Sequence, residues 1–198
     1  MIRIAEFEKV PYEQYRSDLI MQYGSLGGLM TAYGIKSKGE AELLIQHVYD
    51  DIKLPTRATT DSAGYDFFMP MRKSLSEGTT VNVPTGIRVK MEPGWVLMIF
   101  PRSGLGFKYR IQLDNTVGII DGDYYNSDNY GHIHIKITND GYNNKCCDID
   151  SGQGFAQGIF VPFGITFSDK VTEVRNGGFG STTKITPPSN FVGEEAIE

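Results

Sequence analysis

The sequence predicts an all-β fold, a sandwich, barrel or jelly roll, that follows a short helical region near the N-terminus. From Leu54 onward, short apolar runs rich in β-branched residues alternate with turn signals such as Pro-Gly and Asn-Asp-Gly. This region has no strong helical period, and the chain has no repeat of fixed length, so many short strands describe it best. The 198 residues, 40% hydrophobic and 22% charged, suit one packed domain.

The elements are expected in a defined order. Residues 2–10 alternate apolar and polar side chains, which predicts a strand that ends before Pro11. Residues 12–23 and 39–50 have helical spacing or good helix formers and predict two helices, joined by a loose glycine-containing connection. Further strands are expected at residues 81–83, 86–91, 95–100, 132–137 and 158–161. The last residues, after Lys184, contain Pro187-Pro188 and are expected to form a mobile tail.

Charge and composition exclude several classes of function. Nineteen Lys and Arg against twenty-four Asp and Glu give a formal charge of −5, which argues against a nucleic-acid binder and leaves room for a local phosphate site. No run of about 18 apolar residues predicts a membrane span, and Glu6 comes too early for a secretion signal. Cys146 and Cys147 are adjacent and form no disulfide framework, so a cytoplasmic location is expected.

Two glycine-containing clusters suggest phosphate binding. Residues 101–106, with Arg102, Ser103 and Gly104, follow an apolar strand and offer a guanidinium fork, a hydroxyl and open backbone N–H groups. A plain turn with a surface arginine explains this segment equally well. In residues 175–184, Phe179 stands among glycines beside Arg175, Ser181 and Thr182, which favours a nucleotide lid over a disordered linker.

A third segment, residues 113–125, can supply a base and a binding hairpin. Asp121 follows Ile119-Ile120, so its carboxylate is expected to be partly buried at a strand end, with the raised basicity that a general base needs. A turn aspartate is the commoner alternative. His132 and His134 alternate on one strand, but two ligands are too few for a metal site, so a solvated or subunit-facing pair is expected.

Five short segments occur in a fixed order: Ala63-Gly-Tyr-Asp66, Pro101-Arg-Ser-Gly-Leu-Gly106, Asn115 to Tyr124, Gly152-Gln-Gly-Phe-Ala-Gln157 and Gly177-Gly-Phe-Gly-Ser-Thr182. This series resembles the five motifs of the trimeric deoxyuridine triphosphatase (dUTPase) family. The resemblance implies a jelly-roll-like β-barrel or sandwich, in one domain over residues 1–184 with a C-terminal tail at 185–198. It also implies a homotrimer with active sites shared between subunits, which converts dUTP and water to dUMP and pyrophosphate. Mg²⁺ would be held mainly by phosphates and water.

The resemblance assigns roles to individual residues. Asp121 would activate the attacking water, and Asp66 would support the site without touching the substrate. Asn115 and Gly118 would read the uracil edge, and Tyr124 would lie under the deoxyribose. Phe179 would stack on the base. The triphosphate would be held by Arg102, Ser103, Gly104, Gln157, Arg175, Gly180, Ser181 and Thr182.

The chain departs from the family pattern at several places. The fourth motif has Gln153 and Gly154 where the family has an acidic residue and arginine, and Arg175 stands one position closer to the glycine pair than usual. Residues 11–51 are inserted after the first strand. This insertion is expected to be helical and to serve as a decoration, a trimer clasp or a docking surface for a protein partner.

Two other functions remain open at this point. One is dCTP deamination by an enzyme of the same fold. The other is a regulator without enzymatic activity that senses a nucleotide and binds a protein partner through the insertion.

Overall fold

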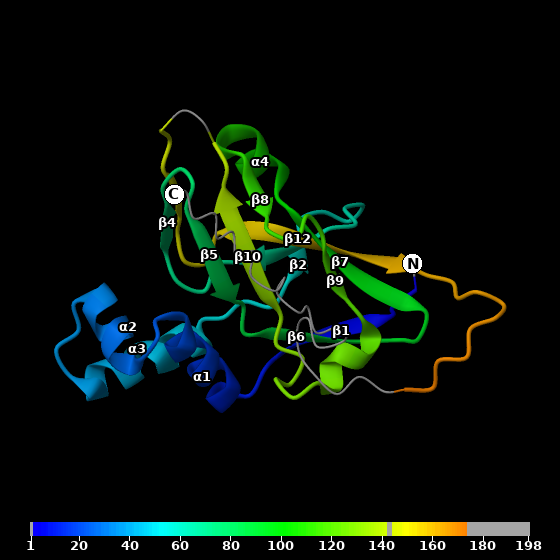
Figure 1. Cartoon of the computed structure of the whole chain (residues 1–198), viewed down its shortest axis with the longest axis horizontal. Coiled ribbons are helices and arrows are strands. Elements are labelled where there is room, and N and C mark those ends of the chain that lie inside the picture. The colour runs from blue at the N-terminus through cyan, green and yellow to red at the C-terminus, as the bar shows by residue number, and fades with distance from the viewer. Residues whose placement is uncertain (1, 142–143, 174–198) are drawn as a thin grey trace, which may run out of the picture.

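The structure is a computed structural model, and it describes residues 2–141 and 144–173. Its main body consists of antiparallel sheets, which confirms the predicted all-β fold (Figure 1). The strands are β1 (Ala5–Lys9), β2 (Thr56–Arg57), β3 (Tyr65–Phe68), β4 (Lys73–Leu75), β5 (Thr80–Pro84), β6 (Ile87–Met91), β7 (Trp95–Pro101), β8 (Ile111–Leu113), β9 (Gly118–Ile120), β10 (His134–Asn139), β11 (Cys147–Ile149) and β12 (Gly154–Pro162). The helices are α1 (Tyr12–Gln22), α2 (Leu26–Tyr33), α3 (Lys38–Asp50), α4 (Ser103–Tyr109) and the 3-10 helix η1 (Gly122–Asn126).

The strands belong to four hydrogen-bonded sheets among the described residues. The largest has the order β2-β3-β12-β7-β9, a three-stranded sheet has the order β5-β10-β8, and β1-β6 and β11-β4 form pairs. Strand β12 is central, because it pairs with β7 from Ala156 opposite Pro101 to Pro162 opposite Trp95. Gly158 on this strand lies so close to Leu97 and Phe67 that any side chain would meet them. Apolar side chains from these strands fill the core between the sheets.

The predicted strands are found with small shifts at their ends. Residues 81–83, 86–91, 95–100 and 158–161 fall on β5, β6, β7 and β12. The strand expected from residue 132 begins at His134, because the His132 N–H donates to the Asn129 carbonyl at 3.1 Å in the preceding turn. The shortest strand, β2, has no clear pattern of its own in the sequence and depends on its pairing with β3.

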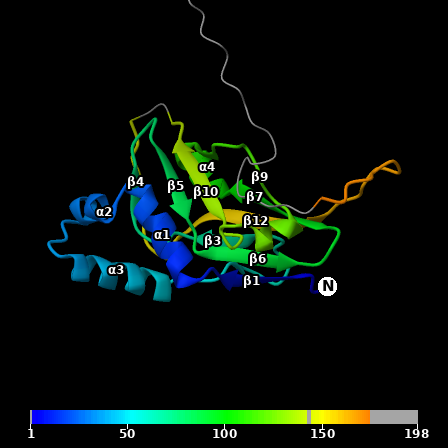
Figure 2. The same ribbon diagram turned by 60° about the horizontal axis from the view of Figure 1, so that its bottom comes forward.

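Helices α1, α2 and α3 lie together at one end of the β-core (Figures 1 and 2). Helix α1 lies beside β5 and fully buries Tyr15 and nearly all of Leu19. The expected loose connection between two helices is wrong over residues 26–33, which form α2. The Ser25 hydroxyl accepts a hydrogen bond from the Gly28 N–H and caps this helix, and Leu29 is fully buried. Packing of Leu29 therefore outweighs the low helix propensity of Gly27 and Gly28.

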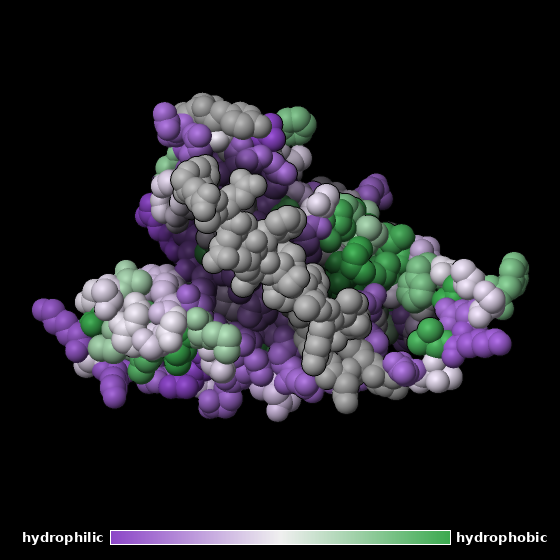
Figure 3. Space-filling view, viewed as in Figure 1, coloured by the Kyte–Doolittle hydropathy of each residue, from purple (hydrophilic) through white to green (hydrophobic). Residues whose placement is uncertain are grey.

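Two surface properties bear on function. None of the described helices has the length and apolar character that a membrane crossing requires. Figure 3 shows an apolar surface over β7 and β9, and on β9 the side chain of Ile119 is 50% exposed.

Candidate active site

The charged side chains of Arg102 and Asp66 and the amide side chain of Gln157 form a polar cluster where β3, β12 and β7 run side by side. Arg102 directly follows β7, and its Nε lies 3.3 Å from Oδ1 of Asp66 on β3. Its Nη1 donates to the Gly154 carbonyl at 3.3 Å, and Gln157 Nε2 donates to the Pro101 carbonyl at 3.1 Å. Neighbouring strands thus hold the guanidinium in place, with Arg102 itself only partly buried.

Residues 101–106 form more than the plain turn considered from the sequence. Arg102 occupies the N-cap of helix α4, so Ser103 and Gly104 are in the first turn of that helix and are exposed. The first N–H groups of an α-helix have no partner within the helix. Arg102, the Ser103 hydroxyl and these N–H groups together make a surface suited to phosphate oxygens.

A cavity of about 420 Å³ opens beside the turn that joins β8 to β9. These two strands belong to different sheets, so they do not form the hairpin expected from the sequence. Asn115 of this turn and Gly118 at the start of β9 line the cavity, with Leu113 and Ile120 beside them. Gly118 packs against Ile99 so closely that an added Cβ would lie 3.1 Å from the Ile99 Cβ. The structure therefore brings Asn115 and Gly118 together on one cavity wall, and their role in binding uracil stays a prediction.

Asp121 lies at the end of β9 and is partly buried. It is the N-cap residue of η1, and its carbonyl accepts a hydrogen bond from the Tyr124 N–H at 3.2 Å. The expected position at a strand end is therefore found, and its role as a base stays a prediction.

Tyr124 is more buried than a sugar-stacking residue needs to be. Only 3% of it is exposed, and its hydroxyl donates to the His132 carbonyl at 2.9 Å. Asn129 Nδ2 donates to the same hydroxyl at 2.8 Å. Tyr124 is not among the residues that line the cavity in this single chain. Its role under the sugar stays a prediction.

Asp121 and Arg102 lie at opposite ends of strand β7. Leu97 of β7 pairs with Ile120, the residue before Asp121. Arg102 lies five residues beyond Leu97, so at about 3.3 Å per residue the two backbone positions are about 17 Å apart. At this separation, Asp121 and Arg102 of one chain do not contact the same phosphate group.

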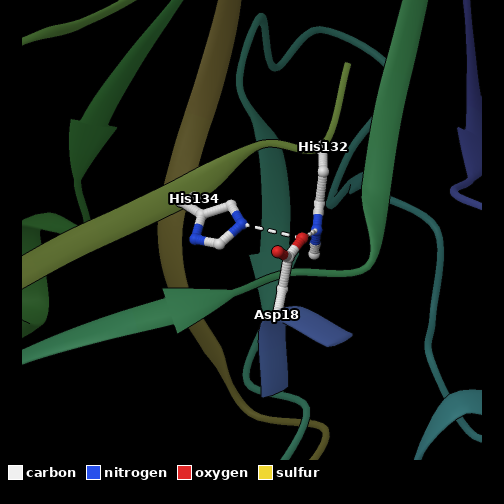
Figure 4. Close-up of side chains that lie close together, drawn as sticks. All are labelled: Asp18, His132 and His134. Carbon is white, nitrogen blue, oxygen red and sulfur yellow. Dashed lines mark hydrogen bonds and ion pairs between the residues drawn. The ribbon is translucent and has the colours of Figure 1, made fainter. Parts of the chain in front are cut away.

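Asp18, His132 and His134 form a polar cluster that joins the inserted helix α1 to β10 (Figure 4). Nδ1 of His132 lies 2.5 Å from Oδ2 of Asp18, and Nε2 of His134 lies 3.3 Å from the same oxygen. His132 is fully buried, and His134 is partly buried. The expectation of a solvated histidine pair is therefore wrong, because α1 covers the strand and supplies a carboxylate.

The hydrogen bonds of this cluster argue against a metal ion, although the three side chains lie close enough to share one. The Gly86 N–H donates to Nε2 of His132 at 2.8 Å, so the proton of this neutral ring sits on Nδ1 and is donated to Asp18. A metal on Nδ1 would require the proton on Nε2, facing the Gly86 N–H. Two donors would then oppose each other in a buried place.

The cluster also fixes the charge of its members. Burial raises the pKa of Asp18, but hydrogen bonds from His132, His134 and Gln14 outweigh burial and hold the pKa well below its usual range. Burial lowers the pKa of His132 below its ordinary value of 6.5, and the Asp18 carboxylate offsets only part of this shift. The cluster is thus a neutral histidine that donates to an ionised aspartate.

The buried His132 is expected to make the free energy of unfolding depend on pH. In the unfolded chain the ring has its ordinary pKa, so the unfolded state binds more protons than the folded state as the pH falls below that value. We expect the free energy of unfolding to decrease by on the order of 1 kcal/mol between about pH 7.5 and 5.5, as measured by urea denaturation. His132→Gln should remove most of this loss, whereas His47→Gln, at an exposed position of α3, should keep it. Equal pH dependence in the His132 variant and the wild type would contradict this assignment.

Comparison with known proteins identifies the chain. Residues 50–183 match the dUTPase family model. The deoxyuridine 5'-triphosphate nucleotidohydrolase of Lactococcus lactis subsp. lactis (strain IL1403) is 37% identical over 144 residues, 71% of this chain and 95% of the relative. The enzyme of the same name from Escherichia coli O45:K1 (strain S88 / ExPEC) is 37% identical over 151 residues, 72% of this chain and 95% of the relative.

The chain belongs to the dUTPase family. Solved structures agree: the crystal structure of the dUTPase from Streptococcus mutans, 38% identical, covers 59% of this chain and 90% of its own with a TM-score of 0.52. A mutant dUTPase from phage phi11 of S. aureus, 22% identical, covers 63% of this chain and 92% of its own with a TM-score of 0.52. That second likeness shows the fold alone, and the phage structure reveals the coordination of a structural Mg(II) ion.

The dUTPase match includes Asp66, Arg102, Asn115, Asp121 and Gln157. Helix α1, with Asp18, lies outside it. Sequence reasoning did not find Asp18, because it lies 114 residues from His132 in the chain and in no recognisable motif. The predicted lid residues Arg175, Phe179, Gly180, Ser181 and Thr182 lie outside the described residues, as does the predicted tail at 185–198.

Proposed function

We propose that this dUTPase hydrolyses dUTP to dUMP and pyrophosphate, in a homotrimer whose active sites each combine residues of different subunits. The observation that carries this proposal is the division of the site within one chain. The cavity is lined by Asn115, Gly118 and Ile120, the residue before Asp121, whereas Arg102 lies at the far end of β7. A partner copy must bring its phosphate-binding group to this cavity. The apolar surface over β7 and β9 is available for such a contact (Figure 3).

The mechanism follows from the residues around Asp121 and from those around Arg102. The Asp121 carboxylate takes the proton of the water that attacks the α-phosphorus. Arg102, Ser103, Gly104 and Gln157 hold the triphosphate and orient it for in-line attack. Asp66, at 3.3 Å from Arg102, holds the guanidinium in position.

Recognition of dUTP is assigned to the cavity and the lid. Asn115 and the backbone at Gly118 bind the uracil edge, and Tyr124 lies under the deoxyribose. Phe179 stacks on the base, while Arg175, Gly180, Ser181 and Thr182 close over the phosphates. This division gives selectivity by hydrogen bonding and by shape.

Mg²⁺ fits this site as an ion bound to the substrate. The carboxylate of Asp66 is paired with Arg102. The proposed phosphate-binding residues around Arg102 therefore offer cationic, hydroxyl and amide groups rather than a set of protein carboxylates. A hard cation that keeps its waters would then be held mainly by phosphate oxygens. When bound, it neutralises part of the triphosphate charge.

We also place the protein in the cytoplasm, since the adjacent Cys146 and Cys147 are free thiols.

The inserted helices expose Met21 and Leu43, which gives a protein partner a surface to bind.

The direct test is an assay with dUTP, dCTP, dTTP and UTP in which pyrophosphate and ammonia are measured separately. Pyrophosphate from dUTP alone is the expected result. Ammonia from dCTP would instead indicate a deaminase, and tight dUTP binding without either product would indicate a nucleotide sensor.

Removing the predicted stacking ring should weaken catalysis. Because base–aromatic stacking is worth about 1–3 kcal/mol, Phe179→Ala should lower kcat/KM for dUTP about tenfold or more, by raising KM and lowering kcat as the lid loosens. Steady-state pyrophosphate release measures this effect. Val171→Ala, at an exposed apolar position before the lid, is the control. Wild-type kinetics in the Phe179 variant would count against stacking.

A further inference from the structure

The insertion reaches the proposed nucleotide cavity through one side chain. Asp18 of helix α1 lines the same cavity of about 420 Å³ as Asn115 and Gly118 of the segment that joins β8 to β9. His134 of β10 lines it too, and its ring points toward the Asp18 carboxylate (Figure 4). One wall of the cavity therefore contains a residue from outside the part of the chain that matches the family model.

The ring of His134 is held at both nitrogens. Asn82 Nδ2 lies 3.0 Å from Nδ1, and an amide nitrogen can only donate, so Nδ1 accepts. The proton of the neutral ring is then on Nε2 and is donated to Oδ2 of Asp18 at 3.3 Å. Asn82 also lines the cavity. Rotation of the ring about its Cβ–Cγ bond would break both hydrogen bonds.

Asp18 is itself held by the rest of the cluster. Oδ2 accepts from Gln14 Nε2 at 2.8 Å, one turn earlier on α1, and from His132. His132 is tied to the turn between β5 and β6 through the Gly86 N–H. Helix α1 is also anchored by Tyr15, which is fully buried. The position of the carboxylate is therefore set by the packing of the insertion against the β-core.

We propose that Asp18 is a positioning residue of the nucleotide cavity: it fixes the His134 ring as a rigid wall, and the inserted helix thereby contributes to nucleotide selectivity. This inference rests on the proposed function, since it takes the cavity as the base and sugar site. A pocket rejects a nucleotide that carries one extra group only when its wall cannot yield. Each nitrogen of the ring already has a partner, so His134 acts through its shape and position.

The test compares selectivity in variants of the full chain. We expect Asp18→Ala and His134→Ala each to lower the preference for dUTP over at least one of dTTP, dCTP and UTP about tenfold, the scale on which pockets discriminate one small group. The preference is the ratio of two kcat/KM values in one preparation, so partial unfolding cancels from it. The kcat for dUTP should change less than its KM, because Asp121 is untouched.

Two further variants make the test specific. The double variant should show no greater loss of preference than the larger single effect, because Asp18 acts through His134. Glu42→Gln is the matched control: it breaks the ion pair with Arg16 between α1 and α3, away from the cavity, and should leave all three preferences unchanged.

The outcomes separate this proposal from the proposed function. Preferences within about twofold of wild type in Asp18→Ala would overturn the positioning role, as would effects of the two single variants that multiply in the double variant. If Asp18→Ala does not fold, unchanged preferences in His134→Ala overturn the proposal by themselves. A wild-type protein that does not turn over dUTP would contradict the proposed function instead.

Discussion

Asp121→Asn is expected to reduce turnover of dUTP about a thousandfold, within the range that general-base catalysis contributes. The amide keeps the size and the position of the carboxylate at the end of β9, but it cannot take a proton from water. The proposed uracil-binding wall at Asn115 and Gly118 is untouched. The dissociation constant of a non-hydrolysable dUTP analogue, measured by calorimetry, should therefore stay close to that of the wild type.

The neighbouring Asp123 supplies the control for this experiment. It lies two residues later in η1, is exposed, and has the same charge. Asp123→Asn should keep near wild-type turnover, which separates loss of a base from loss of one negative charge near the site. Full activity in Asp121→Asn would remove Asp121 from the mechanism and leave the proton acceptor to be found elsewhere.

The sequence was sufficient to predict the β-core and the positions of Arg102 and Asp121 at strand ends, for physical reasons. Strand β7 is a long apolar run between turn signals, and Arg102 and Asp121 each directly follow a predicted apolar run. Such signals are local, so they can be read from neighbouring residues. Helix α2 was not predicted because its stability comes from the burial of Leu29 against the rest of the insertion rather than from its glycine-rich composition.

The polar cluster shows where local reasoning ends. His132 and His134 were recognised as chemically capable, but nothing near them in sequence indicates that α1 covers them. The ionised partner, Asp18, is placed by a tertiary contact between the insertion and β10. The same contact turns a pair of histidines from a solvated surface into a buried cluster and a cavity wall. The environment of the two histidines therefore depends on where the insertion packs, which the neighbouring sequence does not indicate.

Mixing two inactive variants is expected to restore activity if the site is shared between subunits. Arg102→Ala removes the guanidinium that we propose binds phosphate, and Asp121→Asn removes the proposed base. Each variant alone should be inactive. These residues lie at opposite ends of β7, so a shared site takes Arg102 from one subunit and Asp121 from another. In randomly mixed trimers, about a quarter of the sites would hold both native residues. Joint unfolding and refolding of the two variants, followed by a pyrophosphate assay, measures this recovery.

The same experiment distinguishes a shared site from one contained in a single chain. If both residues acted within one chain, every subunit in the mixture would lack one of them and no activity would return. A double variant with both substitutions, refolded with the wild type, is the control. Each of its subunits lacks both groups, and for a shared site the expected activity is again about a quarter, because the two native residues must both come from wild-type subunits. For a site within one chain, this second mixture would retain about half of the activity. Recovery in the first mixture and a quarter in the second are together compatible only with a site built from two copies of this chain.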